Sequence, residues 1–167
     1  EMIGGLRSLL LEREAEILEL LVAETGKTDA IARYDFSMLV DCLDFFVEEV
    51  KRGYEQVVPD YEGNGFHYLK RVPVGVVAAF LAWNFPLLNL GYKLGPILAT
   101  GNACVIKPAQ LTPLSAAYVG ELIHQCDFPA GVVNILLGPA SELCQTISSS
   151  EIPRLLTMIG STPAGLR

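Results

Sequence analysis

From Val74 onward, short apolar runs alternate with segments of helical pattern, and this alternation constrains the fold more than any other feature of the chain. Each run is nearly continuous in apolar residues, as in strands that are covered on both faces of a sheet. Strands that alternate with helical crossovers build a parallel sheet. The predicted strands are VGVVAAFLAW (Val74–Trp83), ACVIK (Ala103–Lys107), VVNILLG (Val132–Gly138) and RLLTMIG (Arg154–Gly160).

Helical segments separate these predicted strands. They begin after Pro86, at Thr112-Pro113 and near Ser141-Glu142, with prolines or hydroxyl side chains at their first positions, where both are favoured. Residues 73–167 are therefore predicted to form an α/β domain, an open parallel Rossmann-like sheet with flanking helices. Sheets of this kind bind their ligands beyond the carboxyl ends of the strands.

A pair of amphipathic helices is predicted in residues 1–53, ahead of the sheet. Apolar residues recur at helical spacing over Leu6–Leu21, and Gly26 supplies a stop. Thr28 is the predicted N-cap of the second helix, which continues until Gly53. This region is expected to be helical throughout.

A β-hairpin is predicted in residues 54–72, between the helices and the sheet. Val57-Val58 on one side and Phe66 and Tyr68 on the other flank Asn64-Gly65. An Asn-Gly pair between such segments is the strongest short-range signal of a hairpin turn. We therefore expect a two-stranded excursion here.

Charge and hydropathy exclude several classes of function. Lys and Arg number 12 against 19 Asp and Glu, and the formal charge of −7 offers no field that attracts phosphate backbones or anionic lipid. No apolar stretch reaches the roughly 18 to 20 residues of a membrane span, and the N-terminus lacks the layout of a signal peptide. We expect a cytoplasmic protein with no nucleic-acid or membrane partner.

The metal-binding residue types are sparse and scattered. The four cysteines show no C-x-x-C pairing, and there are only two histidines, so we expect no metal site, no disulfide framework and no histidine-based triad. The cysteines are interpreted as structural thiols, with Cys126 and Cys144 on or beside helices that lie far from the carboxyl ends of the strands. The cysteines and histidines of the chain are Cys42, Cys104, Cys126, Cys144, His67 and His124.

Polar or small residues stand at the carboxyl end of every predicted strand. Because the carboxyl ends of parallel strands meet at one edge of the sheet, we expect these residues to form a nucleotide site, although loops at this edge are polar in any case. They are, in chain order, Trp83 and Asn84, then Lys107 and Gln110, then Gly138, and finally Gly160 and Ser161.

Three of these positions have physical roles that the residue types suggest. Ser161 opens a predicted helix, whose free N–H groups and dipole suit a pyrophosphate. Lys107 lies where such folds recognise the adenosine ribose, and the uncharged Gln110 is the nearest candidate for the carboxylate that normally selects NAD. No G-x-G-x-x-G follows the first strand, which disfavours an ordinary Rossmann dehydrogenase.

Several ordered motifs carry a resemblance to a known family. The stretch PVGVVAAFLAWNFPLLNLGYKLGPILATGNACVIKPAQLTP, followed by FPAGVVNILLG and IGSTPAG, resembles the NAD(P)-dependent aldehyde dehydrogenase superfamily. The resemblance begins in the first helical region, where ETGKT also fits, and runs to the last residue. It implies the N-terminal, cofactor-binding portion of a truncated aldehyde dehydrogenase-like fold. The complete protein would be a homo-oligomer, with residues 54–72 as an oligomerisation-type hairpin.

The resemblance also implies an activity and a set of site residues. The complete protein would oxidise a small aldehyde to a carboxylic acid with NAD or NADP, through a cysteine thiohemiacetal. Asn84 would donate its amide N–H to the oxyanion that develops during the reaction. The cofactor contacts would come from Leu81, Trp83, Lys107, Gln110, Gly138, Gly160 and Ser161.

Departures from the family pattern limit this interpretation. Gln110 stands where glutamate is usual, which leaves NAD and NADP both open. The family's nucleophilic cysteine and general-base glutamate lie beyond Arg167, and none of the four cysteines fits that role, so this chain alone is predicted to be inactive. The alternatives are a non-catalytic short relative that binds a cofactor or assists assembly, and an acyl-CoA-type or acyl-phosphate-type reductase.

Overall fold

The computed structural model describes residues 2–166, and it begins with three helices rather than the expected pair. The first predicted helix is divided at Arg13 into α1 (Met2–Glu12) and α2 (Glu14–Thr25). Arg13 leaves helical geometry, with φ −101° and ψ 15°, and the change of direction lets both helices bury leucines. The third helix, α3, covers Asp29–Val50. Gly26 ends α2 in the left-handed conformation at φ 68°, which confirms the predicted stop.

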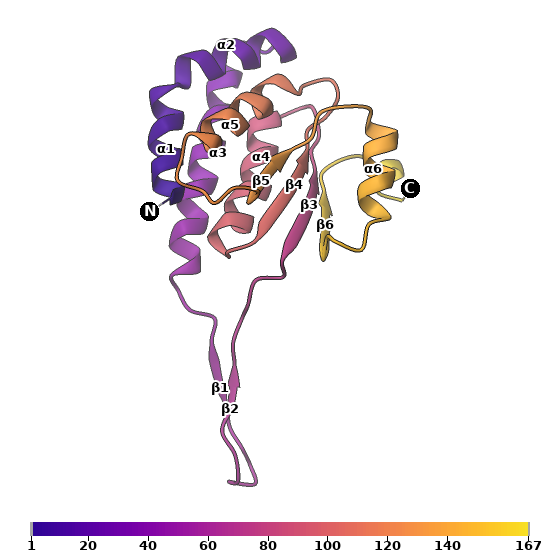
Figure 1. Cartoon of the computed structure of the whole chain (residues 1–167). Coiled ribbons are helices and arrows are strands. Elements are labelled where there is room, and N and C mark those ends of the chain that lie inside the picture. Colours follow the sequence, from indigo (N-terminus) through magenta and orange to yellow (C-terminus); the bar gives the residue numbers. More distant parts are fainter. Residues whose placement is uncertain (1, 167) are drawn as a thin grey trace.

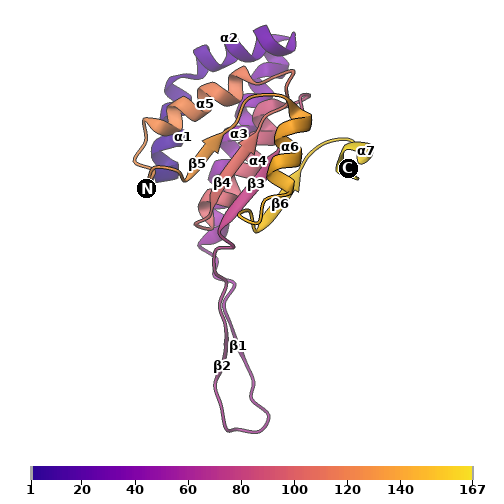
Figure 2. The same ribbon diagram turned by 45° about the vertical axis from the view of Figure 1, so that its right-hand side comes forward.

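The predicted hairpin is present, as an arm that extends away from the rest of the molecule (Figures 1 and 2). Strand β1 (Gln56–Val58) pairs antiparallel with β2 (His67–Leu69), and Val58 lies opposite His67. The connection is not confined to Asn64-Gly65, because residues 59–66 form a longer loop. Pro59 cannot donate to the ladder, and the Asp60 carboxylate accepts backbone N–H groups of Glu62 and Gly65 instead.

The predicted parallel sheet has four strands in the order β5-β4-β3-β6, all parallel. The strands match the apolar runs but are shorter at most ends, because the last residues of the runs belong to the following loops. Their bounds are β3 Val76–Phe80, β4 Ala103–Lys107, β5 Val133–Ile135 and β6 Leu155–Met158. Successive strands step in one direction from β3 to β5, and β6 then returns to the other side of β3.

The crossover helices lie on both faces of the sheet. Helices α4 (Pro86–Ala99) and α5 (Leu114–His124) pack on one face, with α1, α2 and α3 outside them, while α6 (Ala140–Ser148) lies on the other side (Figures 1 and 2). A single turn, α7 (Thr162–Gly165), follows β6. No helix in residues 2–166 is long and apolar enough to span a membrane.

Helices α3 and α4 pack closely against each other, and two glycines permit it. A Cβ at Gly91 would lie 3.0 Å from the Leu39 Cα, and one at Gly95 would lie 2.8 Å from the Phe46 ring and 3.2 Å from the Cys42 carbonyl oxygen. The backbones therefore approach at a distance that larger side chains would prevent. This contact fixes where α4 starts relative to α3.

Candidate functional site

The carboxyl ends of the strands form a continuous edge, which we call the rim. Backbone hydrogen bonds continue one residue past the strands: Leu81 N–H donates to Lys107 O at 3.0 Å, and Ile159 N–H donates to Phe80 O at 3.0 Å. The order of the strands reverses direction between β3 and β6. In open α/β sheets, this switch point is where ligands bind.

The residues after β3 leave the sheet in a short turn that leads into α4. Strand β3 ends at Phe80 rather than at the tryptophan. The next residue, Leu81, is still buried, whereas Trp83 is 60% exposed. Asn84 is exposed, two residues before the first residue of α4, Pro86. The structure therefore places the predicted oxyanion donor at the rim, beside the switch point.

One end of the Asn84 amide is occupied by the side chain of Asn89. The Asn89 Nδ2 group donates to the Ala82 carbonyl oxygen at 3.1 Å and lies 3.4 Å from Asn84 Oδ1. No hydrogen bond from Asn84 Nδ2 is found within residues 2–166. Its N–H groups are therefore free to donate to a ligand.

A buried ion pair holds the start of α4. Asp35 on α3 is fully buried, accepts the Leu88 N–H at 2.7 Å and binds Lys27 Nζ at 2.5 Å. The Lys27 ammonium also lies 4.0 Å from the centre of the Phe85 ring. Burial raises the pKa of Asp35, while Lys27 and the backbone N–H groups of α4 oppose the rise. The turn that carries Asn84 is thus fixed from α3 as well as from α4.

Lys107 ends β4 with its side chain folded over the rim. It is only 4% exposed, and its Nζ donates to the Pro108 carbonyl oxygen at 2.6 Å. Burial lowers the pKa of Lys107, and the nearby Cys144 opposes that shift. An ammonium group has three N–H donors, so this amine retains capacity for a further acceptor such as a ribose hydroxyl.

Gln110 and Gly138 lie in the loops that follow β4 and β5. Gln110 is exposed in the turn before α5. Gly138 has φ 146°, and a Cβ there would lie 3.2 Å from Leu143 Cδ1, so the position favours glycine on both grounds. The loop after β5 therefore stays close to α6.

Gly160 and Ser161 follow β6 at the far side of the switch point. A Cβ on Gly160 would lie 2.9 Å from the methyl end of the flexible Met158 side chain, which could shift to accept it. Ser161 takes the N-cap position of α7, but its hydroxyl makes no capping hydrogen bond, and α7 is one turn long. None of the hydroxyl caps expected from the sequence is formed, since Thr28 at α3 also makes no side-chain cap.

The cysteines have the character of structural thiols. Cys104 lies inside β4, and burial raises its pKa to about 11, while burial also raises the pKa of Cys42 and Cys126. Cys144 was expected far from the rim, and this is wrong, because α6 brings it near Lys107. No group of three metal-ligating side chains occurs in the described part of the chain.

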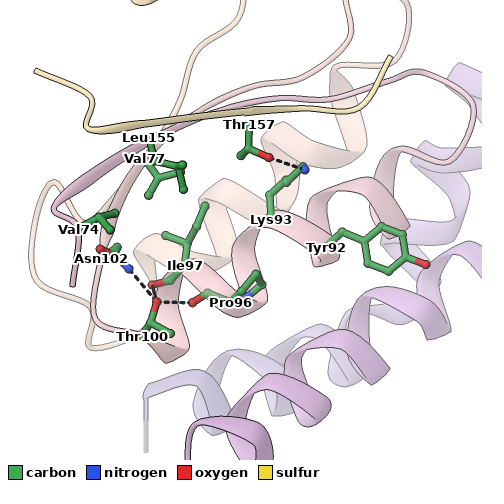
Figure 3. A pocket seen from close by; sticks show the side chains of 10 residues that line it. All are labelled: Val74, Val77, Tyr92, Lys93, Pro96, Ile97, Thr100, Asn102, Leu155 and Thr157. Carbon is green, nitrogen blue, oxygen red and sulfur yellow. Dashed lines mark hydrogen bonds between the residues drawn. The ribbon is translucent and has the colours of Figure 1, made fainter. Parts of the chain in front are cut away.

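A separate, mostly apolar pocket of about 280 Å³ lies between α4 and the β3–β6 edge (Figure 3). Lys93 of α4 reaches across it and donates to Thr157 Oγ1 at 2.7 Å, and burial lowers the pKa of Lys93. None of the predicted catalytic or cofactor-binding residues lines this pocket. Its lining residues are Val74, Val77, Tyr92, Lys93, Pro96, Ile97, Thr100, Asn102, Leu155 and Thr157.

Sequence reasoning missed the groups that support the Asn84 turn. Asn89 and Asp35 are polar residues on otherwise apolar helix faces, flanked by residues such as Leu90 and Phe36. A lone polar residue on a buried face was the available signal, because burial requires it to find a hydrogen-bond partner. Which partner it finds could not be read from that pattern.

The strand order and the rim define the class of protein as an open α/β sheet of the dinucleotide-binding type. The model of the aldehyde dehydrogenase family matches residues 1–167, and the chain belongs to that family. It spans about a third of the length of the curated relatives it matches, and it aligns with their N-terminal portion.

Individual relatives agree with this assignment. The succinate-semialdehyde dehydrogenase [NADP(+)] of Escherichia coli is 35% identical over 158 residues, which cover 95% of this chain and 33% of that protein. The succinate-semialdehyde dehydrogenase structure from Burkholderia pseudomallei has a TM-score of 0.96 at 31% identity, over 99% of this chain and 34% of the other. An NAD+ complex of aldehyde dehydrogenase from Bacillus cereus has a TM-score of 0.94 at 32% identity, with 99% and 34% covered.

Proposed function

We propose that residues 1–167 form the NAD(P)-binding part of an enzyme that oxidises a small aldehyde to a carboxylic acid. The observation that carries the proposal is Asn84 at the switch point of the rim, with its amide nitrogen unbonded within residues 2–166. Membership of the aldehyde dehydrogenase family supports it. A cytoplasmic location is part of the same proposal.

The rim residues suit a nicotinamide dinucleotide. Lys107 offers N–H donors of a partly desolvated amine to ribose hydroxyls, and Gly138 keeps the loop after β5 free of a side chain. Ser161, Gly160, Trp83 and the backbone of Leu81 complete the proposed contacts. The cofactor, when bound, would accept the electrons and hydrogen removed from the aldehyde carbon. One relative's title names NAD+ and another's name gives NADP(+), so both remain in the proposal.

In the proposed reaction, this chain stabilises negative charge. When a cysteine thiolate adds to an aldehyde, the carbonyl oxygen becomes an oxyanion, and the Asn84 N–H is placed to donate to it. A preorganised donor of this kind strengthens its bond only in the transition state, and thus raises kcat rather than affinity. None of the four cysteines here is proposed as that nucleophile, and residues 1–167 alone are expected to be inactive.

The test is Asn84→Ala in the full-length protein. We expect kcat to fall roughly a hundredfold or more while the dissociation constants for NAD+ and NADP+ stay nearly unchanged. Asn102→Ala is the matched control, because this asparagine bonds Gly75 and Thr100 at the opposite end of the sheet. An unchanged kcat for Asn84→Ala would remove the oxyanion role.

Cofactor preference is proposed to depend on the charge at position 110. The neutral Gln110 near the cationic Lys107 should tolerate the 2′-phosphate of NADP, whereas a carboxylate there would repel it and accept the ribose hydroxyl of NAD. Gln110→Glu should therefore raise the ratio of kcat/KM for NAD over NADP. A constant ratio would show that position 110 does not select the cofactor.

We also propose that the hairpin arm serves assembly of a homo-oligomer. A two-stranded hairpin is marginally stable alone, and this one exposes large apolar side chains, with Tyr61 97%, Phe66 77% and Val57 62% exposed. Charged substitutions at Val57 and Phe66 should lower the mass measured by sedimentation equilibrium. An unchanged mass would place the oligomer contact elsewhere.

A further inference from the structure

We infer that Asn89 is a positioning residue that decides which end of the Asn84 amide faces the rim. The inference rests on the proposed function, in which Asn84 must present its N–H groups to an oxyanion. An asparagine amide has nearly the same shape in its two orientations, one of which would present oxygen and repel that charge. The catalytic orientation therefore needs a neighbour that distinguishes the two ends.

The Ala82 carbonyl oxygen fixes the orientation of Asn89. This oxygen can only accept hydrogen bonds, and the Asn89 side chain is 5% exposed, with its terminal group 3.1 Å away. The group that faces the carbonyl must therefore be the NH2 end of Asn89, because an oxygen there would leave two acceptors in contact. The backbone of the turn thereby sets the first amide.

Asn89 then fixes the orientation of Asn84. Its NH2 group lies 3.4 Å from the nearer end of the Asn84 amide, and that end must be the oxygen, because two NH2 groups would repel. The Asn84 nitrogen is then at the end of the amide away from Asn89, on a residue that is exposed. The Ala82 carbonyl thus fixes the orientation of the Asn89 amide, and the Asn89 amide fixes the orientation of the Asn84 amide.

Helix geometry and α3 keep these groups in register. Asn89 lies in the first turns of α4, where its backbone N–H donates to the Phe85 carbonyl oxygen at 2.9 Å. The Asp35 carboxylate holds the same helix end through Leu88 N–H. Asn89 is therefore attached to a rigid element, and its contact with Asn84 Oδ1 is the one side-chain hydrogen bond found for that exposed amide within residues 2–166.

Two substitutions at this position test the inference in the full-length protein. Asn89→Leu removes the group that distinguishes the two ends of the Asn84 amide, and it should lower kcat roughly two- to tenfold, the effect of one neutral hydrogen bond. Asn89→Asp keeps the shape but presents an acceptor, which should attract the NH2 end of Asn84 and lower kcat more than Asn89→Leu does. For both, KM and the dissociation constants for NAD+ and NADP+, measured by calorimetry, should stay nearly constant.

A double variant separates positioning from a general loss of structure. Asn84→Ala/Asn89→Leu should be no slower than Asn84→Ala, because an alanine has no amide to orient. Asn102→Leu is the control for removing a buried amide elsewhere, and it should leave kcat unchanged. The assays use the aldehyde turned over fastest by the unmodified protein among propanal, benzaldehyde and succinate semialdehyde.

The outcomes distinguish the two proposals. If Asn84→Ala lowers kcat but Asn89→Leu and Asn89→Asp do not, Asn89 has no positioning role and the proposed function stands. The same conclusion follows if the losses of kcat from Asn84→Ala and Asn89→Leu multiply in the double variant. If Asn84→Ala leaves kcat unchanged, both proposals are overturned. A loss of kcat confined to the singles and absent on the Asn84→Ala background supports the inference.

Discussion

The chain up to α5 and the chain after it differ in how much apolar surface they bury. Nearly all of the buried apolar side chains precede residue 124, and Ile147 of α6 is the only one after it in residues 2–166. Strand β6 shares a parallel ladder with β3, yet its leucines remain about half exposed. The exposed apolar residues of this second region include Leu136, Leu137, Ile152, Leu155, Leu156 and Met158.

This difference assigns most of the stability to the first region, whereas the second region mainly supplies residues to the rim. The first region has its own core between α1–α5 and the sheet, and it fixes the turn that carries Asn84. The second region adds Gly138, Gly160 and Ser161 to the rim but contributes little to the core. Exposed apolar patches of this kind are typical of surfaces that bind another molecule. We expect substitutions in the two regions to differ accordingly.

The largest expected contrast compares the same substitution in the two regions. Leu90→Ala, at a fully buried position on α4, should lower the free energy of unfolding by about 2–5 kcal/mol. Leu156→Ala, at a position 47% exposed on β6, should cost less than about 1 kcal/mol. Urea denaturation measures both. Equal losses would mean that β6 is buried by contacts in solution.

Alkaline pH should destabilise the first region through Cys104. Its pKa is about 11 in the fold, against an ordinary value of 9.0, so the folded state keeps a proton that the unfolded chain loses. Stability is unaffected below about pH 9, falls as the pH rises toward 11, and changes no further above that, by about 2–3 kcal/mol in total.

Cys104→Ala tests the origin of this pH dependence. The alanine variant should be less stable at neutral pH but should lose less between pH 9 and 11, as measured by urea denaturation across that range. Cys144→Ala, at a partly buried position on α6, is the control in the second region. An unaltered pH slope in Cys104→Ala would assign the effect to other groups.

Two glycine-to-alanine changes in helices should have opposite signs. At Gly95 the new methyl group would lie 2.8 Å from the Phe46 ring, and overpacking of the α3–α4 contact should cost about 1–3 kcal/mol. At the exposed Gly5 of α1, nothing lies within 4 Å of the new Cβ, and Gly5→Ala should stabilise by about 0.5–1 kcal/mol. Thermal unfolding measures both, and a stabilising Gly95→Ala would contradict the described α3–α4 packing.

The smallest contrast concerns the ends of two helices. Glu24 of α2 accepts hydrogen bonds from the N–H groups of Leu114 and Ser115 at the start of α5. Glu24→Ala should cost about 0.5–2 kcal/mol, as the loss of a helix cap does. Ser161→Ala should cost almost nothing in urea denaturation, because its hydroxyl caps nothing. A larger loss for Ser161→Ala would reveal a cap that forms in solution.

Much of the fold could be predicted because its signals are local. The apolar runs gave β4 with its correct bounds and the other three strands within a few residues, and Gly26 gave the end of α2. The rim residues could be predicted as a group, since parallel strands all deliver their carboxyl ends to one edge. Their contacts with a cofactor stay a prediction.

Other features could not be predicted because several local solutions compete. Asn64-Gly65 suits a tight turn, but Pro59 and Asp60 together favour a longer loop. The break at Arg13 lies inside a sequence with continuous helical spacing, so only the need to bury both segments reveals it. Thr112 before α5 suggested a local cap, but the Glu24 carboxylate of α2 accepts the first N–H groups of that helix instead.

The parallel sheet, the succession of its strands and crossover helices, and the edge at which a ligand would bind could all be predicted from the amino-acid sequence. These follow from hydrophobic period and chain direction, which neighbouring residues encode. Only the tertiary structure decided that Glu24 caps α5, that Asp35 holds α4 and that Asn89 meets Asn84. Glu24 and Asp35 bind backbone groups 90 and 53 positions away, and the Asn89 contact depends on how the turn after β3 folds back onto α4. Such bonds form because packing brings buried polar groups together and burial requires them to be paired.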